Sequence, residues 1–285
     1  VKRKYLKFLR SQEVTSEPFR DKIGQLKKFY LPISKMIKEE YFKKKKTNVI
    51  GLSGGQGTGK STISSILKII LKEAYGLQTT IFSIDDFYKT LNERKKISKK
   101  ISALFLTRGV PGTHDTKMIY SCIKKLKKKN FKKCMIPKFD KSIDDRLPKN
   151  SWFKVKKKPN IVIFEGWCVG ATAQKKKDLI YPVNKLEKQE DNKKIWRFKV
   201  NLELKKNYKK IFELIDKIIF LKVPSFKYVT KWRLLQEKKL RITSRGNKTM
   251  SDKQIRNFVM YYERITKHML DILPKKADTV ISIDR

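Results

Sequence analysis

Two apolar patterns alternate along the chain. Short runs rich in apolar residues predict buried strands at residues 49–53, 161–164 and 217–221. Residues 79–84, rich in β-branched residues, and residues 278–283 at the end of the chain are also predicted to be strands. Between them, apolar residues recur with the spacing of helices that pack on a sheet, as in residues 63–74 and 255–270. This alternation predicts an α/β fold with a parallel sheet, right-handed crossovers and a binding site at the carboxyl ends of the strands.

The remaining segments divide the chain further. Residues 1–46 are basic and predicted to be a helical extension packed on a core domain formed by residues 47–285. Residues 134–137 read as a short strand, and residues 168–194 as an irregular excursion over the surface. Ser251 and Gln254 form a capping-box pair, which predicts the start of a helix. The polar, basic residues 241–250 before it have the composition of a mobile lid.

A glycine-rich stretch joins the first predicted strand to the helix that follows. Its residues are Gly54, Gly55, Gln56, Gly57, Thr58, Gly59, Lys60, Ser61 and Thr62. Gly54, four residues and then Gly59-Lys60-Ser61 match the P-loop pattern, in which backbone N–H groups surround a triphosphate. Lys60 would reach the β and γ phosphates, and Ser61 would hold Mg²⁺. The strand before and the helix after favour this interpretation over an accidental glycine-rich turn, so ATP and Mg²⁺ are the expected cofactors.

Three acidic residues follow predicted strands at the edge where the P-loop lies. Asp85 and Asp86 follow the second strand, and Glu165 follows residues 161–164. Phosphoryl transfer to an alcohol needs a carboxylate to accept the hydroxyl proton and others to fix the metal. The alternative is that these residues only cap helices or form turns, and we expect only one of the two neighbouring aspartates to face the site.

Several motifs together resemble the glycerate kinase family, a branch of the P-loop kinases that also includes uridine kinase, pantothenate kinase and phosphoribulokinase. They are Tyr30-Leu31-Pro32, the P-loop, Ser83 to Tyr88, Arg108 to Asp115, Asp140-Lys141-Ser142, Phe164 to Trp167, and Trp232-Arg233 with Gln236-Glu237. The stretch Arg-Gly-Val-Pro-Gly-Thr-His-Asp at residues 108–115 is the most specific of them. The sequence departs from the usual pattern at Lys138-Phe139, where a tyrosine is common, and in the lysine-rich residues 168–194.

The resemblance implies a three-layer αβα P-loop fold with a C-terminal lid and assigns roles to individual residues. Asp85 takes the position of the proton-accepting aspartate, and Glu165 would hold the metal, or its water, together with Ser61. The expected substrate residues are Asp85, Asp86, Tyr88, Arg108, His114, Asp140 and Arg146. For two of them a structural role is the alternative: His114 would only form hydrogen bonds to the backbone of its turn, and Arg146 would be a surface charge.

Arginines near the lid are the candidates for neutralising charge on the transferred phosphoryl group. They are Arg233, Arg241 and Arg245, and Arg241 is assigned to catalysis with Lys60, Asp85 and Glu165. Trp167 and Trp232 are expected to be packing residues.

The charge is extreme, with 71 Lys and Arg against 27 Asp and Glu and a net charge of +44. It raises the possibility of a nucleotide-dependent nucleic-acid-binding protein. The lysine runs lack the interleaved aromatic residues of a base-stacking surface, so we interpret them as solvated faces and expect no nucleic-acid partner. The charge should still attract anionic substrates in a salt-dependent way.

The favoured function is an ATP-dependent kinase that phosphorylates D-glycerate, a small hydroxy acid, to 3-phosphoglycerate. The alternative within the same class is a kinase for a uridine-like or pantothenate-like acceptor. Three widely spaced cysteines and the lack of a long apolar run predict a reducing, cytoplasmic location without membrane contact. An organelle stroma is the alternative if a transit peptide was removed before Val1.

Overall fold

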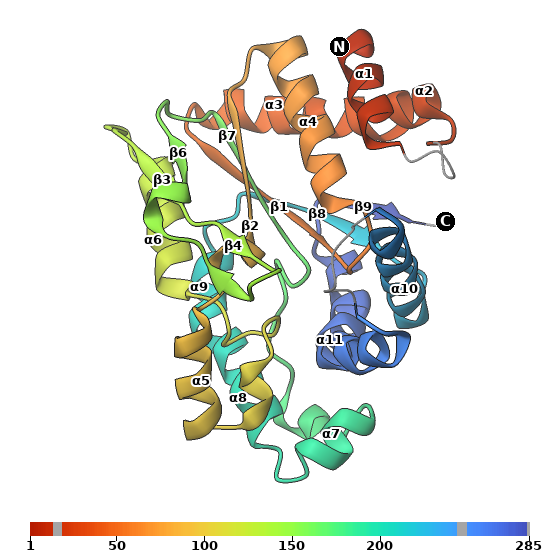
Figure 1. Ribbon diagram of the computed structural model, residues 1–285. Helices are drawn as coiled ribbons and strands as arrows, with labels where there is room; N and C mark the ends of the chain where they lie inside the picture. Colours follow the sequence, from red (N-terminus) through yellow and green to blue (C-terminus); the bar gives the residue numbers. More distant parts are fainter. Residues whose placement is uncertain (14–18, 244–249, 284–285) are drawn as a thin grey trace.

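A five-stranded parallel sheet forms the centre of the protein in a computed structural model, which describes residues 1–13, 19–243 and 250–283 (side chains of residues 239, 240, 242 and 243 excepted) (Figure 1). Its strands are β1 (Asn48–Gly54), β2 (Thr79–Ser83), β7 (Ile161–Gly166), β8 (Lys217–Lys222) and β9 (Thr279–Ser282). Their order is β2-β7-β1-β8-β9, and every neighbouring pair is parallel. The predicted parallel sheet is confirmed.

Helices cover both faces of this sheet. Successive side chains of β1 point to opposite faces, so Ile50 packs with α3 (Leu31–Lys44) and α4 (Lys60–Tyr75), whereas Val49 packs on the other side. That second core includes residues of α6 (Thr116–Lys127), α8 (Ile195–Glu203), α9 (Lys209–Phe212) and α11 (Asp252–Ile272). The expected three-layer αβα arrangement is therefore present.

The N-terminal residues are helical and pack on α4. They form α1 (Lys2–Gln12), α2 (Lys22–Gln25), a wide turn at Leu26–Tyr30, and α3. Tyr5 and Leu9 of α1 are buried against Ile66 and Ile70 of α4. This segment thus lies behind the helix that follows the P-loop.

Two small antiparallel pairs lie outside the central sheet. The strand expected at residues 134–137 is β3 (Cys134–Ile136), which pairs with β6 (Phe153–Val155). The other pair is the hairpin of β4 (Phe139–Asp140) and β5 (Asp145–Arg146). This hairpin projects over the carboxyl edge of the central sheet and contributes to the site.

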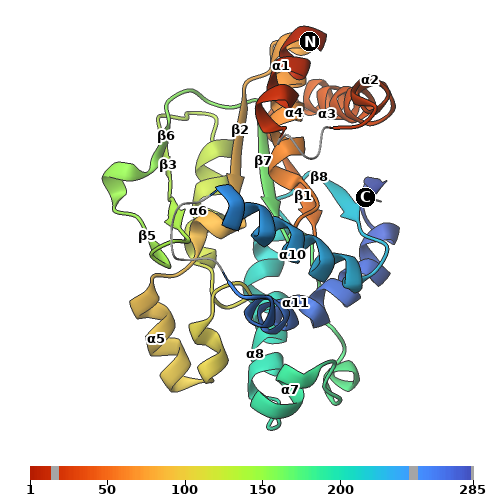
Figure 2. The ribbon, with the colours of Figure 1, turned by 45° about the vertical axis from the view of Figure 1, so that its right-hand side comes forward.

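Two long helices complete that edge. Figure 2 shows α10 (Phe226–Thr243) beside α11, near the ends of β1 and β8. Ser251 accepts from the backbone N–H of Gln254, whose side chain accepts from the N–H of Ser251, so the predicted capping box is confirmed. Of the predicted lid, residues 244–249 lie outside the described residues. No helix in the described ranges is long and apolar enough to cross a membrane.

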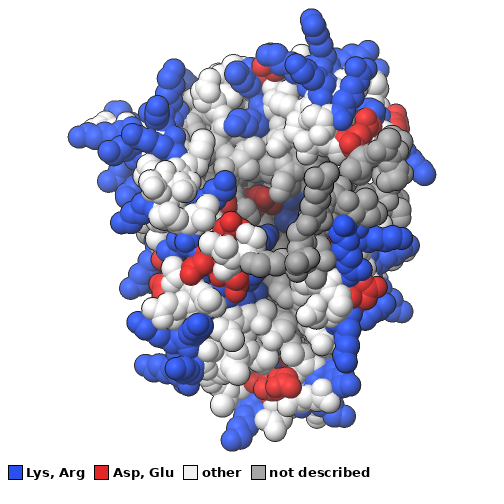
Figure 3. Space-filling view, in the orientation of Figure 1, with Lys and Arg blue, Asp and Glu red and all other residues white. Residues whose placement is uncertain are grey.

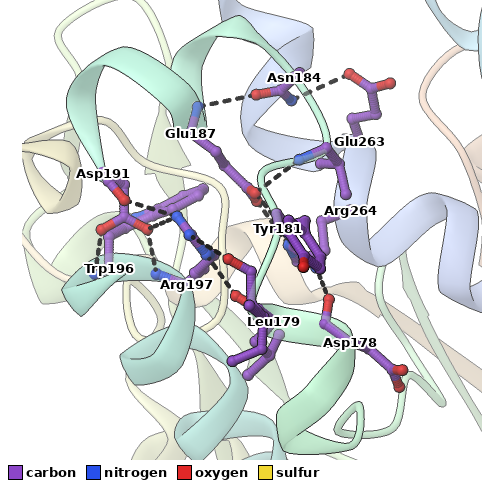
Figure 4. A network of polar contacts seen from close by, with 12 residues as sticks. Asp178, Leu179, Tyr181, Asn184, Glu187, Asp191, Trp196, Arg197, Glu263 and Arg264 are labelled. Carbon is purple, nitrogen blue, oxygen red and sulfur yellow. Dashed lines mark hydrogen bonds and ion pairs between the residues drawn. The ribbon is translucent and has the colours of Figure 1, made fainter. Parts of the chain in front are cut away.

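The predicted surface excursion is fixed by buried polar contacts (Figure 4). It contains α7 (Lys185–Glu190). Helix α5 (Leu91–Lys100), which belongs to another part of the chain, lies at the same end of the molecule (Figure 1). Glu187 of α7 binds Arg264 of α11 through two contacts of 2.6 and 2.7 Å, and Asp191 binds Arg197 of α8 at 3.0 Å. All four side chains are buried, so the segment is anchored on α8 and α11 although its sequence is irregular.

Candidate active site

A cavity of about 540 Å³ opens at the carboxyl edge of the central sheet. The P-loop, the ends of β2 and β7, the β4–β5 hairpin, α10 and α11 all contribute to its lining. The register explains why these parts meet, because Ser53, just before the P-loop, lies beside Gly166 of β7, and Ser83 of β2 lies beside Glu165. The predicted carboxylates Asp85, Asp86 and Glu165 therefore share the cavity with Lys60 and Ser61.

The P-loop presents backbone donors and one half-buried cation. Gly57 has φ of +79°, and a Cβ atom there would lie 2.9 Å from Cβ of Trp232, so the position requires glycine. Gly59 precedes α4 without a side-chain cap, which leaves the helix N-terminus open to an anion. Lys60 donates to the carbonyl oxygens of Gly54 and Gly55 at 2.9 Å, and burial lowers its pKa. An incoming phosphate would offer this ammonium a charged partner in place of two carbonyls.

Ser61 and Glu165 meet at the bottom of the cavity. The Ser61 hydroxyl donates to Oε1 of Glu165 at 2.8 Å, and Glu165 is only 7% exposed. Burial raises the pKa of Glu165, opposed by Lys60 and by the bond from Ser61. The described residues contain no cluster of three or more His, Cys, Asp or Glu that could hold a metal. A hydroxyl and one carboxylate beside a phosphate site do fit Mg²⁺, which is usually held by few protein ligands and substrate phosphates.

The two aspartates after β2 have different partners. Asp86 caps the 3₁₀ turn Ile84–Phe87, with Oδ2 accepting from Ser83 N at 2.9 Å, and burial raises its pKa to about 6. Asp85 accepts from the Tyr88 hydroxyl at 2.9 Å and from Lys141 at 2.7 Å. Burial works to raise the pKa of Asp85, but Lys141 and Tyr88 outweigh it and lower the pKa to about 2. Both aspartates line the cavity, although only one was expected to face it.

The stretch from Arg108 to Asp115 is a tight turn held by its own side chains. Gly109 has φ of +140°, and Thr113 accepts from its N–H at 3.0 Å while donating to Val110 O at 2.7 Å. Asp115 caps α6 by accepting from Met118 N at 3.0 Å. The turn places Arg108 in the cavity, where its guanidinium lies 5.7 Å from the Phe139 ring and pairs with Asp144.

His114 lies behind the cavity and does not line it. Its ring stacks on Tyr88 with a centroid distance of 4.4 Å, and its Nδ1 lies 2.6 Å from the Tyr208 hydroxyl. The same hydroxyl also accepts from Gly112 N at 3.1 Å, so it links the imidazole to the backbone of the Arg108–Asp115 turn. Burial lowers the pKa of His114 to about 3, so the ring is neutral at physiological pH. In this position the ring supports Tyr88, and through it Asp85.

Two further predicted substrate residues also lie outside the cavity lining. Arg146 donates to the Tyr88 carbonyl through two nitrogens, at 2.7 and 3.1 Å. Asp140 accepts from the backbone N–H and the hydroxyl of Ser142, at 2.8 and 2.6 Å. A direct substrate contact for either residue stays a prediction, while Tyr88 does line the cavity.

The lid arginines occupy different places. Arg233 lines the cavity and pairs with Glu237 at 2.6 Å. Arg241 pairs with Asp252 at 2.9 Å outside the cavity, so its catalytic assignment stays a prediction, and Arg245 lies outside the described residues. Trp167 and Trp232 are buried as packing residues, and Trp167 also lines the cavity.

Aromatic residues of α11 contribute to the cavity, and sequence reasoning placed them in the core. Phe258 and Tyr262 belong to the predicted apolar stripe of this helix. The Tyr262 hydroxyl donates to the Arg108 carbonyl at 3.3 Å, and the ring packs edge-on against Trp167. A tyrosine in an apolar stripe was the available signal, because its hydroxyl needs a polar neighbour when it is buried.

The surface charge does not concentrate in the cavity. Figure 3 shows Lys and Arg side chains spread around the outline of one face, whereas acidic side chains gather near its central hollow. The cations that line the cavity are Lys60, Arg108, Lys141 and Arg233. This placement matches solvated lysine faces outside a site with a few specific cations.

A P-loop and three carboxylates at the edge of a parallel αβα sheet define the class of a P-loop kinase, an ATP-dependent phosphotransferase with an alcohol acceptor. The chain belongs to the phosphoribulokinase/uridine kinase family, whose model matches residues 49–198. It is 34% identical over 222 residues to the uncharacterized kinase mug58 of Schizosaccharomyces pombe, covering 75% of this chain and 78% of that protein.

Two further comparisons agree with this assignment. The chloroplastic D-glycerate 3-kinase of Arabidopsis thaliana is 30% identical over 250 residues, which are 83% of this chain and 52% of that protein, so the match spans about half of the plant enzyme. A solved D-glycerate 3-kinase from Cryptococcus neoformans superposes with a TM-score of 0.72 at 24% identity, over 84% of this chain and 87% of that one, and supports the fold.

Proposed function

We propose that this kinase transfers the γ-phosphoryl group of ATP to a hydroxyl of D-glycerate, giving 3-phosphoglycerate. The observation that carries the proposal is the pair of cations beside the candidate base, because Arg108 and Lys141 line the same cavity as Asp85. Arginine and lysine are the side chains that bind a carboxylate by charge-assisted hydrogen bonds. The similarity to a plant D-glycerate 3-kinase supports the same acceptor.

The chemistry follows from the arrangement of the cavity. The P-loop amides and Lys60 bind the β and γ phosphates, and the acceptor hydroxyl oxygen forms the new bond to the γ phosphorus. The bond from that phosphorus to the bridging oxygen breaks, and its electron pair leaves with ADP. Asp85 takes the hydroxyl proton. Ser61 and Glu165 would hold Mg²⁺, which neutralises charge on the phosphates when it is bound.

An acceptor panel tests the proposal. Purified protein, ATP and Mg²⁺ are incubated with D-glycerate, L-glycerate, glycerol, uridine or pantothenate, and ADP release is measured with each. D-glycerate should give the highest kcat/KM, and NMR of the product should place the phosphate on the terminal hydroxyl. A lack of stimulation by D-glycerate together with stimulation by uridine or pantothenate would replace this acceptor with that one.

A variant pair locates the acceptor site. Arg108→Gln should raise the KM for D-glycerate by roughly tenfold or more, because it removes a charge-assisted bond to the carboxylate. Arg256→Gln is the matched control, since Arg256 is exposed and lies outside the cavity. Equal KM values for the two variants would remove Arg108 from acceptor binding.

A further inference from the structure

Lys141 forms a direct ion pair with Asp85, the candidate base. Its ammonium lies 2.7 Å from Oδ2 of Asp85, while the Tyr88 hydroxyl donates to Oδ1 at 2.9 Å. Each oxygen of the carboxylate thus has a donor before any acceptor is bound. A proton from an acceptor hydroxyl requires a carboxylate oxygen within hydrogen-bond reach, and Lys141 stands at the oxygen that Tyr88 leaves open.

The hairpin that carries Lys141 is anchored at its turn and at its second strand. Arg94 is fully buried, donates to the Asp144 carbonyl at 2.6 Å and pairs with the Asp144 carboxylate at 3.0 Å. Arg146, on the second strand of the hairpin, donates to the Tyr88 carbonyl. These contacts fix the position of the turn relative to the cavity.

The Lys141 side chain itself has fewer contacts than the turn that carries it. It is 61% exposed, and among the residues that the structure describes Asp85 is the one carboxylate within 4 Å of its ammonium. Ion pairs of this exposure contribute little to stability, so exchanging one carboxylate partner for another has a small cost. A flexible side chain on a fixed turn can therefore change partners without moving the fold.

We propose that Lys141 is an acceptor-dependent switch: it blocks Asp85 in the absence of acceptor and moves to the carboxylate of the bound acceptor, which frees Oδ2 of Asp85 for the hydroxyl. This inference rests on the proposed function in one respect, the negative charge of the acceptor. A water molecule beside ATP meets a blocked base, whereas an anionic hydroxy acid unblocks the base as it binds, so wasteful ATP hydrolysis is suppressed.

Phosphoryl transfer follows the same course to an acceptor hydroxyl and to water. With acceptor, the hydroxyl oxygen binds the γ phosphorus, ADP leaves with the bridging electron pair, and Asp85 takes the proton. With water, the same bonds change and inorganic phosphate forms. Lys141 loses no proton in either case, since it moves from Asp85 to the acceptor carboxylate when acceptor is bound and keeps its pair with Asp85 when only water is present.

The ATP phosphates are the competing partner for Lys141. Lys141 lines the same cavity as Lys60 and Ser61, so the ammonium lies near the phosphate side of the cavity as well. A phosphate ligand would be required for ATP binding, whereas a switch acts on the acceptor and on hydrolysis. Loss of a phosphate ligand would therefore raise the KM for ATP, whereas loss of the switch would raise the KM for the acceptor and the rate of hydrolysis.

The test compares Lys141→Met with Lys138→Met, a control that removes an equivalent charge from an exposed position outside the cavity. Lys141→Met should raise ATP hydrolysis without acceptor by roughly tenfold, because it exposes a base whose contribution is about 10²–10⁴-fold. It should raise the KM for D-glycerate by roughly tenfold or more and leave the KM for ATP unchanged. The control should match the wild type in all three measurements.

Two results would overturn the switch. One is unchanged acceptor-free hydrolysis in Lys141→Met, and the other is a raised KM for ATP without any increase in hydrolysis. The hydrolysis measurement needs no acceptor, so it separates this inference from the acceptor assignment. If D-glycerate fails in the wild type but Lys141→Met still raises hydrolysis, the acceptor is wrong and the blocked base is supported.

Discussion

Replacing Asp85 with asparagine tests the assignment of the base with little disturbance to the fold. The asparagine oxygen can still accept from the Tyr88 hydroxyl, which now lies 2.9 Å from the carboxylate. Lys141 loses its partner, but its side chain is 61% exposed and water can solvate the ammonium. Because the folded state lowers the pKa of Asp85 from 3.8 to about 2, we expect the free energy of unfolding at pH 7 to fall by about 2 kcal/mol.

The kinetic effect should be much larger. Removing a general base costs about 10²–10⁴ in rate, which corresponds to about 3–5.5 kcal/mol of transition-state stabilisation. The Asp85 side chain bonds Tyr88 and Lys141, neither of which belongs to the P-loop, so the Kd for ATP should stay within about twofold, a change of less than 0.5 kcal/mol by the same arithmetic.

The assay measures kcat from ADP release with saturating ATP and acceptor, and the Kd for ATP by calorimetry. Glu213→Gln is the matched control, because it makes the same carboxylate-to-amide change at an exposed position of the chain. A turnover of Asp85→Asn equal to that of the control would refute the role of Asp85. A large loss of ATP affinity would instead show that Asp85 acts in nucleotide binding.

Three further predictions concern residues around the site. Burial raises the pKa of Asp86 in the folded state from 3.8 to about 6, so the native state loses stability as the pH rises through that value. The amide in Asp86→Asn does not ionise, so the free energy of unfolding of this variant relative to wild type should increase by up to about 3 kcal/mol between pH 4 and pH 7, measured by urea unfolding. Glu187→Gln leaves Arg264 buried without its anion and should lower the free energy of unfolding by about 3 kcal/mol, read from the urea midpoint. Because His114 has its pKa lowered to about 3, His114→Gln should not remove any limb of the activity profile between pH 5 and pH 8, and the loss of such a limb would contradict a neutral imidazole.

Local patterns predicted the central strands and the main helices. Continuous apolar runs identify β1, β7 and β8 because both faces of these strands are covered by helices. Ser251 and Gln254 identify the start of α11 because both members of a capping box are close in sequence. The geometry of a parallel sheet then brings Asp85 and Glu165 to the P-loop without further information.

Contacts between distant segments were not predictable in this way. Strand β6 follows a lysine-containing stretch and has no apolar run of its own, so its pairing with β3 left no local signal. Arg264 and Glu187 are charged residues in a basic chain, and composition suggests that such residues are solvated. Their burial depends on α7 and α11 meeting in three dimensions, which no single segment encodes.

The stretch at residues 108–115 shows why a motif does not identify contact residues by itself. Arg108 enters the cavity, whereas His114 packs behind Tyr88, although both were expected to bind substrate. The turn directs Arg108 into the cavity and His114 away from it. A specific motif can therefore include residues that position the site as well as residues that line it. His114 and Arg146 both hold Tyr88, and Tyr88 holds Asp85. Changes to these supports should therefore reduce kcat more than they raise the KM of the acceptor, which is the opposite of the pattern expected for Arg108.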